Sequence, residues 1–355
     1  MIGACPPHCG GRAPIAYGRW VHLAIAGSVA TDHLQTFEGK FSDSLVPDQL
    51  DKLAVSFLVD DLDVRRGGCA ANISFGLGSL GLRPTLVAAV GRDFVDQGYR
   101  AWLENAGVDC SRLLISPTLH TALCTITTDA AHAQIVTFYP GAMAQARQID
   151  IAQLHADTPI DLLLVGPDDP EGMLRHTRAA RELAIPFAAD PSQQLAWAGG
   201  ELIADLIDGA AYLFSNDYEA ALIEKKTGWS DDDIAERVGV RVVTHGKDGC
   251  VVHAADGTRH EVAAIEGVTA VDPTGVGDSF RAGFLAGVAA GLDLERAAQV
   301  GCTIAASVVE TIGTQEYRLE RSGFLDRVES TYGAEARADI GAALSISHDE
   351  VVKSG

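Results

Sequence analysis

Residues 271–283 read VDPTGVGDSFRAG, and this stretch joins a turn with two glycines to the start of a helical pattern. Apolar residues recur at helical spacing after the turn. The first N–H groups of a helix lack internal partners, and the helix dipole adds partial positive charge there. Glycines also let this backbone approach an anion closely. The stretch therefore predicts an anion-binding turn formed by Gly275, Val276 and Gly277.

Asp278 lies at the edge of this turn. A carboxylate there repels a phosphate, so it does not help to bind the anion itself. It suits a general base that takes a proton from a hydroxyl while the hydroxyl attacks a phosphoryl group. A capped surface turn, in which Asp278 complements the helix dipole, is the other interpretation.

The run from Asp272 to Asp278, followed by an apolar helix, resembles the anion-hole and base motif of the ribokinase-like (PfkB) carbohydrate and nucleoside kinases. The resemblance implies an α/β fold with a central, mostly parallel sheet flanked by helices, and a small antiparallel β-sheet lid. It also implies that Asp278 activates the acceptor hydroxyl. The N–H groups of the turn would then hold the charge of the transferred phosphoryl group.

Short apolar runs alternate with helical stretches along the chain, and this alternation indicates a parallel sheet with helices on both faces. Ligands of such sheets bind beyond the carboxyl ends of the strands. The predicted strands are residues 21–26, 85–90, 161–165, 185–189, 211–214 and 240–244.

Two segments, 37–56 and 121–138, break this alternation. Their partly alternating Thr, Val, Ile and Phe residues predict a small antiparallel sheet in two pieces. The resemblance implies that this sheet is a lid over the acceptor. Because a small sheet has exposed edges and one exposed face, we expect a homodimer that buries them. The remaining boundaries are a large α/β domain at 21–36, 57–120 and 139–340, a disordered extension at 1–20, and a C-terminal tail at 341–355.

The composition limits the partners and the location. The 355 residues carry a formal net charge of -21, which disfavours nucleic acid and anionic membranes as partners. No apolar run reaches the ~20 residues of a membrane span, and residues 1–20 lack the apolar core of a signal peptide. Seven scattered cysteines indicate reduced thiols. We therefore expect a cytoplasmic protein.

Polar residues follow the first predicted strand and open a later helix. Ser28 and Asp32 come soon after that strand, and a carboxylate there can accept hydrogen bonds from a vicinal diol. A turn residue is an equally good interpretation of Asp32 alone. The Gly67-Gly68 pair followed by Asn72 resembles the acceptor signature of the family. The resemblance implies that Ser28, Asp32, Gly68 and Asn72 hold ribose hydroxyls.

Gln193 and Gln194 follow another predicted strand, and each amide presents a donor and an acceptor. Such groups can pair with the edge of a heterocycle, which a simple sugar lacks; plain turn residues are the other interpretation. The runs DPSQQ at 190–194, SFLVD at 56–60 and FYPGAM at 138–143 resemble bacterial adenosine kinases of the ribokinase type. The nucleoside-binding residues that this resemblance adds are Ser56, Phe57, Phe138, Met143, Gln193 and Gln194. Cys124 stands where we expect an aromatic side chain, so stacking from that strand is reduced.

The resemblance extends to the nucleotide. Asn216 and Glu219 match an Asn-x-x-Glu motif whose side chains orient the waters of Mg²⁺, and an N-terminal capping box explains the pair equally well. Thr244, Gly246 and Gly249 match the family's nucleotide-binding loop. The Gly313-Thr314-Gln315 loop is similar to one near the adenine or a monovalent cation such as K⁺.

The sequence thus predicts an ATP- and Mg²⁺-dependent adenosine kinase that forms AMP. Asp278 is the predicted base for the ribose 5′-hydroxyl. A ribokinase-like kinase of ribose or fructose is the first alternative, and a nucleoside-binding sensor without turnover is the second. The predicted partners are ATP and a nucleoside.

Overall fold

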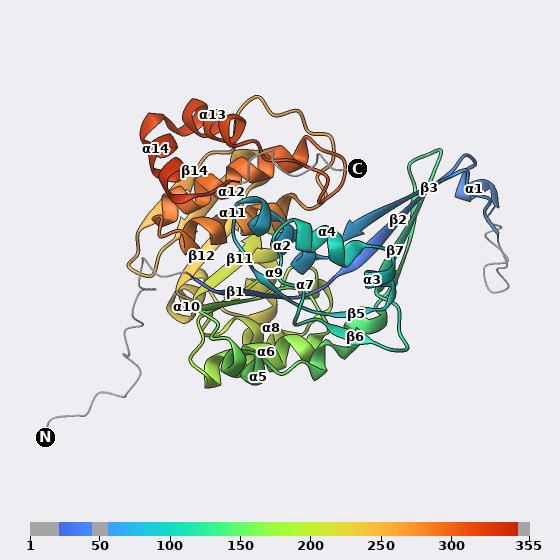
Figure 1. Ribbon diagram of the computed structural model, residues 1–355, viewed down its shortest axis with the longest axis horizontal. Helices are drawn as coiled ribbons and strands as arrows, with labels where there is room; N and C mark the ends of the chain where they lie inside the picture. Colours follow the sequence, from blue (N-terminus) through green and yellow to red (C-terminus); the bar gives the residue numbers. More distant parts are fainter. Residues whose placement is uncertain (1–20, 45–55, 347–355) are drawn as a thin grey trace, which may run out of the picture.

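The computed structural model describes residues 21–44 and 56–346, and an eight-stranded sheet forms its centre (Figure 1). Six neighbouring strands, from β4 to β12, run parallel, and β13 and β14 add an antiparallel edge. The strands in order across the sheet are β14 (Arg259–Val262), β13 (Cys250–His253), β12 (Val240–Thr244), β11 (Tyr212–Asn216), β10 (Phe187–Ala189), β9 (Leu162–Val165), β1 (Leu23–Ala26) and β4 (Thr85–Val87).

The strands are apolar at consecutive positions because both faces of the sheet are covered. In β1, Leu23 and Ile25 join one buried apolar cluster, whereas Ala24 and Ala26 join the other. Each of the six predicted runs overlaps a strand of this sheet, so the predicted fold is confirmed. The run at 85–90 is divided: its end belongs to β5 (Ala89–Gly91), which pairs with β6 (Leu114–Ser116).

Helices cover both faces of the sheet (Figure 1). On the Leu23 face lie α2 (Cys69–Ser79), α3 (Asp93–Asp96), α4 (Tyr99–Asn105), α11 (Val276–Ala289), α12 (Leu294–Val309), α13 (Arg321–Tyr332) and α14 (Ala334–Ala343). On the Ala24 face lie α5 (Ile151–Asp157), α6 (Pro170–Glu182), α7 (Gln194–Trp197), α8 (Gly200–Ile207), α9 (Asp217–Thr227) and α10 (Asp231–Arg237). The 3₁₀ helices are η2 (Gly141–Gln148) and η3 (Gly246–Asp248).

Helices α11 and α12 pack without an intervening side chain at Gly283. A Cβ atom at Gly283 would lie 2.7 Å from the Cα of Gly301, closer than real Cβ contacts come. A Cβ at Gly287 would meet the Cα of Ala297 at 2.6 Å. The helix that begins at the predicted anion-binding turn is therefore fixed against its neighbour by backbone contact.

A second, four-stranded sheet projects from the body (Figure 1). Its strands in order are β3 (Asp61–Gly67), β2 (Ala30–Phe37), β7 (Ala122–Asp129) and β8 (Gln134–Tyr139). The pairings β2–β3 and β7–β8 are antiparallel, and the central pairing β2–β7 is parallel. We call it the small sheet.

The strands of the small sheet differ from their predicted positions in the first segment. Its first two strands flank 37–56 instead of lying within it, and α1 (Phe41–Ser44) follows β2. Residues 45–55 lie outside the described part of the chain. The predicted boundary was wrong because β2 and β3 are rich in polar and charged residues, so a search for apolar runs passes over them. The second segment does contain β7 and most of β8.

The predicted C-terminal tail begins too early. Helix α14 continues past residue 340 to Ala343, and Leu344 and Ile346 are buried in the core on the Leu23 face. Residues 347–355 and the predicted extension at 1–20 lie outside the described residues. None of the helices within 21–44 and 56–346 has the length and apolar character that a membrane span needs.

Candidate active site

A cavity of about 940 Å³ opens at the carboxyl ends of the parallel strands, between them, the small sheet and the start of α11. Parallel sheets place ligands at this edge. The predicted site residues that line it are Ser28, Asp32, Gly68, Asn72, Phe138, Met143, Gln193, Gln194, Asn216, Glu219, Thr244, Gly246, Gly249, Gly275, Val276, Gly277 and Asp278.

The predicted anion-binding turn leads directly into α11. Gly275 precedes the helix with φ of 77°, a left-handed conformation that favours glycine. A Cβ at this position would also lie 2.9 Å from side-chain atoms of Thr314. Val276 and Gly277 occupy the first turn, where backbone N–H groups lack helical partners. Glycine is thus required at 275 by both conformation and space.

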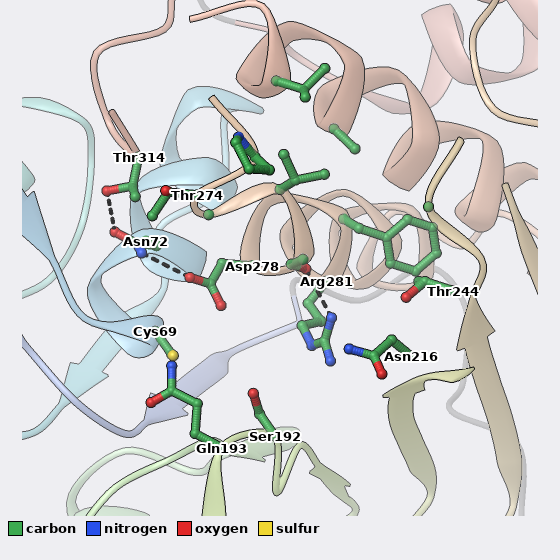
Figure 2. A pocket seen from close by; sticks show the side chains of 18 of the residues that line it. Cys69, Asn72, Ser192, Gln193, Asn216, Thr244, Thr274, Asp278, Arg281 and Thr314 are labelled. Carbon is green, nitrogen blue, oxygen red and sulfur yellow. Dashed lines mark hydrogen bonds between the residues drawn. The ribbon is translucent and has the colours of Figure 1, made fainter. Parts of the chain in front are cut away.

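Asp278 is half-buried in the first turn of α11. Its Oδ2 accepts a hydrogen bond of 2.8 Å from Nδ2 of Asn72 (Figure 2). Burial raises the pKa of Asp278 to about 6, and Asp190 adds to this rise, whereas Asn72 and the Arg281 guanidinium oppose it. The carboxylate is therefore ionised at neutral pH and holds a proton affinity suited to a general base.

Asn72 is itself held by the loop that follows α12. Its Oδ1 lies 2.9 Å from Thr314 Oγ1 and accepts a 2.8 Å hydrogen bond from Nε2 of Gln315. Gln315 is fully buried and also contacts the Tyr99 hydroxyl at 2.7 Å. The sequence pointed to this loop but did not connect it with Asn72, because residues 72 and 315 are far apart in the chain.

Arg281 and Asp190 form a buried ion pair that the sequence analysis missed. Nε and Nη2 of Arg281 donate to the two carboxylate oxygens of Asp190 at 2.5 and 2.9 Å. Nη1 donates to the carbonyl of Gly277 at 3.1 Å, and Nη2 lies 3.8 Å from Oε2 of Glu219. In Figure 2 the guanidinium lies between Asp278 and Asn216. One side chain thus connects the anion-binding turn with the end of β10 and the start of α9.

The sequence contains little that could predict the Arg281–Asp190 ion pair. Arg281 lies one turn beyond Asp278, and Asp190 opens the DPSQQ run, so both belong to stretches that resemble the family. Ninety-one positions separate them, and only the fold reveals that they meet.

Asn216 and Glu219 form an N-terminal capping box at the start of α9, as one of the two interpretations predicts. Their contact with the waters of Mg²⁺ stays a prediction. Oδ1 of Asn216 accepts from the Glu219 N–H, and Oε2 of Glu219 accepts from the Asn216 N–H, both at 2.8 Å. Within 21–44 and 56–346, no group of three or more His, Cys, Asp or Glu side chains could hold a metal ion. Mg²⁺ commonly binds through phosphates and waters with few protein ligands, and this pair of oxygen donors fits that mode.

The predicted base-reading amides lie across the cavity from α11. Gln193 reaches into the cavity in Figure 2. Nε2 of Gln194 donates to the main-chain carbonyl of Asp168 at 2.8 Å, so one of its donors is already used. The Asp168 side chain is buried and lines the same cavity.

Asp168 was not predicted, although it lies in the loop between β9 and α6. Its Oδ1 accepts from the Asp169 N–H at 2.8 Å, and among the described residues its Oδ2 has no hydrogen-bond partner. Burial raises the pKa of Asp168 to about 8, and the neighbouring Asp169 charge acts in the same direction. This carboxyl group is therefore protonated at neutral pH.

Two predicted nucleoside residues lie elsewhere. Ser56 and Phe57 are not among the residues that line the cavity. The Phe57 ring packs instead against Phe37 and Phe41, with centroids 5.1 and 5.0 Å away. The β2–α1 segment thus partly covers this ring, and a nucleoside-binding role of Ser56 and Phe57 stays a prediction. Cys124 does line the cavity, paired in register with Asp32.

Residues 42–321 match the pfkB family of carbohydrate kinases. The chain belongs to this family. It is therefore a kinase, and the α/β body with the small sheet is the ribokinase-like fold.

Three relatives illustrate what this pfkB kinase is similar to. A nucleoside kinase of Methanocaldococcus jannaschii is 32% identical over 70% of this chain and 80% of its own length. An ATP-dependent ribose-1-phosphate kinase of Halopiger xanaduensis is also 32% identical, over 65% of this chain and 76% of its own. The structure of Burkholderia thailandensis nucleoside kinase in complex with inosine superposes with a TM-score of 0.76 at 35% identity, covering 88% and 97% of the two chains. Membership of the family therefore leaves the substrate to be argued from the cavity.

Proposed function

We propose that this pfkB kinase transfers the γ-phosphoryl group of ATP to the 5′-hydroxyl of a purine nucleoside, with adenosine as the substrate and AMP as the product, a purine salvage reaction. One observation carries the proposal. A single cavity holds Asp278 beside an anion-binding turn and, on its other side, the amide of Gln193 (Figure 2), and the neighbouring Gln194 lines the same cavity. A kinase of a simple sugar has no use for a pair of amides that can read a heterocycle.

The ribose is assigned to the part of the cavity nearest the small sheet. Asp32 on β2 lines it, and burial raises the pKa of this carboxyl group, although the Arg65 charge opposes the rise. A carboxylate can accept two hydrogen bonds from the vicinal 2′- and 3′-hydroxyls. Ser28 and Gly68 add a hydroxyl and a backbone surface at the same end.

The base is assigned to the region of Gln193, Gln194, Phe138 and Met143. Gln194 uses one N–H on Asp168, so its second N–H and its Oε1 are left for the base, and Oε1 can accept from an exocyclic amino group. Gln193 offers both a donor and an acceptor. The nucleoside kinase of Burkholderia thailandensis binds inosine, and this relative supports a purine nucleoside as the substrate here.

The nucleotide is assigned to the other end of the cavity, where Thr244, Gly246 and Gly249 line it. Lys247, which the sequence analysis did not select, lines it as well and adds a positive charge. Asn216 and Glu219 would orient waters of Mg²⁺. When bound, the metal ion neutralises charge on the ATP phosphates.

The chemical step follows from the position of Asp278. The O5′–Pγ bond forms while the bond from Pγ to the ADP oxygen breaks, and the hydroxyl proton passes to Asp278. Since Oδ2 accepts the hydrogen bond from Asn72, we assign the proton to Oδ1. The N–H groups of Gly275, Val276 and Gly277 would stabilise the charge on the transferred group. Enclosure of the acceptor excludes water as a competing nucleophile.

The further elements of the proposal concern assembly, a second cation and location. Leu62 and Val64, which share one face of the small sheet, each keep half or more of their surface exposed, and burial of this surface in a homodimer would remove it from water. Sedimentation as a monomer at micromolar concentration would contradict the dimer.

The Gly313–Gln315 loop is the proposed binding place for K⁺. A comparison of the activity in a K⁺ salt with the activity in a choline salt tests this assignment. We place the reaction in the cytoplasm.

A coupled assay of ADP formation tests the proposed function. The panel contains adenosine, inosine, cytidine, ribose and fructose at equal concentrations. We expect adenosine to give the highest kcat/KM and ribose to be a poor acceptor. Equal or faster turnover of ribose or fructose would identify a sugar kinase instead. Tight nucleoside binding without ADP formation would identify a sensor.

A further inference from the structure

The end of strand β3 is hydrogen-bonded to two side chains, Thr314 and Tyr99, that are also connected to Asn72, the partner of the general base Asp278. Oγ1 of Thr314 lies 2.9 Å from the carbonyl oxygen of Arg66, and the Tyr99 hydroxyl donates to the carbonyl oxygen of Gly67 at 2.8 Å. Thr314 also contacts Asn72, and Tyr99 contacts Gln315. The small sheet and Asp278 are thus joined by a short series of side chains.

The hydrogen bond from Tyr99 to Gly67 determines which groups donate and which accept along the series from Tyr99 to Asp278. A carbonyl oxygen only accepts, so the single Tyr99 proton goes to Gly67. Tyr99 must then accept from Gln315, whose amide nitrogen also donates to Oδ1 of Asn72. With Oδ1 used in this way, Asn72 presents Nδ2, a donor, to Asp278.

The series is shielded from water. Tyr99, Gln315, Asn72 and Thr314 are all buried, so water cannot replace a missing donor at low cost. The Arg66 side chain adds a second anchor for the strand end, because its guanidinium lies 4.3 Å from the centre of the Trp102 ring.

We propose that Gln315 and Tyr99 are positioning residues that act through Asn72 to set the orientation and proton affinity of Asp278, and that they make both depend on the position of the end of β3. The inference rests on the proposed role of Asp278 as the base. It gives the small sheet a part in the chemical step in addition to covering the acceptor.

Three variants test the series. Gln315→Leu removes one of the two donors that face Oδ1 of Asn72 and so weakens the hold on the Asn72 amide. We expect kcat to fall about tenfold, the value of one lost hydrogen bond. Gln315→Glu puts an acceptor against Oδ1 of Asn72 and favours the opposite amide orientation, which turns an oxygen toward Asp278. We expect Gln315→Glu to lower kcat further than Gln315→Leu. Tyr99→Phe should give a smaller loss, about threefold, because Asn72 keeps its bond from Gln315.

The decisive readout is the pKa of Asp278, followed by ¹³C NMR of labelled aspartate carboxyl groups in protein without substrate. The resonance is assigned by its absence in Asp278→Asn. The other charged or titratable groups that interact with Asp278 are Arg281, Asp190, Cys69 and Tyr317, and none of them is changed. We expect a higher pKa in both Gln315 variants and an acid limb of kcat/KM shifted to higher pH by the same amount.

Gln299→Leu is the matched control. Gln299 is a buried glutamine on α12 that bonds to Arg296 and is not among the residues that line the cavity. We expect it to leave kcat and the pKa of Asp278 unchanged. An unchanged Asp278 pKa in Gln315→Leu would overturn the inference. Because the NMR titration needs no turnover, this result is distinct from a wild-type protein that phosphorylates no nucleoside, which would overturn the proposed function.

Discussion

Asp278 and Asp168 line the same cavity, and burial raises the pKa of both carboxyl groups, to about 6 and about 8. The difference lies in their neighbours. Asp278 accepts a hydrogen bond from the Asn72 side chain and feels the Arg281 charge. Asp168 has one main-chain donor and an acidic neighbour, Asp169.

The comparison teaches how one pocket keeps one acid ionised and another protonated at pH 7. Burial favours the protonated form of both groups, and a fixed amide donor with a nearby guanidinium opposes it for Asp278. Only the ionised group can accept a proton. The neutral group can instead donate a hydrogen bond.

The largest expected effect comes from Asp278→Asn. The change keeps the shape but removes the proton acceptor, so we expect kcat to fall by about 10²–10⁴-fold. Nucleoside affinity, measured by calorimetry, should change little. A variant with nearly normal kcat would remove Asp278 from the base role. Joint loss of binding and turnover would indicate a folding defect instead.

The pH dependence of the wild-type enzyme sharpens the same comparison. The base must be ionised, so kcat/KM should fall about tenfold per pH unit below pH 6 and stay level from pH 7 upward until other groups titrate. Asn72→Leu removes a hydrogen bond to the charged form, which raises the pKa of Asp278 and moves this limb to higher pH. An acid limb of kcat/KM that stays at the same pH in Asn72→Leu would show that Asn72 does not control the pKa of Asp278.

Asp168→Asn tests the neutral acid through stability. The pKa of Asp168 is higher in the folded than in the unfolded chain, so its contribution to stability is fully present below about pH 4 and is lost as pH rises toward 8. Asp168→Asn has no carboxyl group to ionise, so it does not lose this stability as the pH rises. We expect its free energy of unfolding, relative to wild type, to increase between pH 5 and pH 8 by up to about 1.4 kcal/mol per unit. Urea unfolding at several pH values measures this, and parallel curves would show an ionised Asp168.

The smallest expected effect is that of Gln193→Ala. A neutral hydrogen bond contributes roughly 0.5–1.5 kcal/mol, so KM for adenosine should rise by only a few-fold. The loss should be smaller for ribose, which has no base edge. Equal losses for adenosine and ribose would place Gln193 away from the base.

The sequence predicted most of the sheet because its strands are apolar on both faces. It also predicted the residues of the cavity that follow strand ends or open helices, such as Asp278 and Asn72. The edges of the small sheet were missed, since β2 and β3 carry polar residues on partly exposed strands. The contacts between distant segments were missed for another reason. The Arg281–Asp190 pair and the Gln315–Asn72 bond depend on how the helices and strand ends meet in space, and spacing along the chain does not encode that.

The close contact of α11 with α12 at Gly283 and Gly301 has a practical side for anyone who randomises this chain to change its acceptor. Substitutions at these two positions push whole helices apart, so such clones would drop out at expression and say nothing about selectivity. A useful library would leave both glycines fixed and place its diversity at Gln193, Phe138 and Met143. The helix that carries Asp278 then serves as an unchanging reference against which altered acceptors are compared.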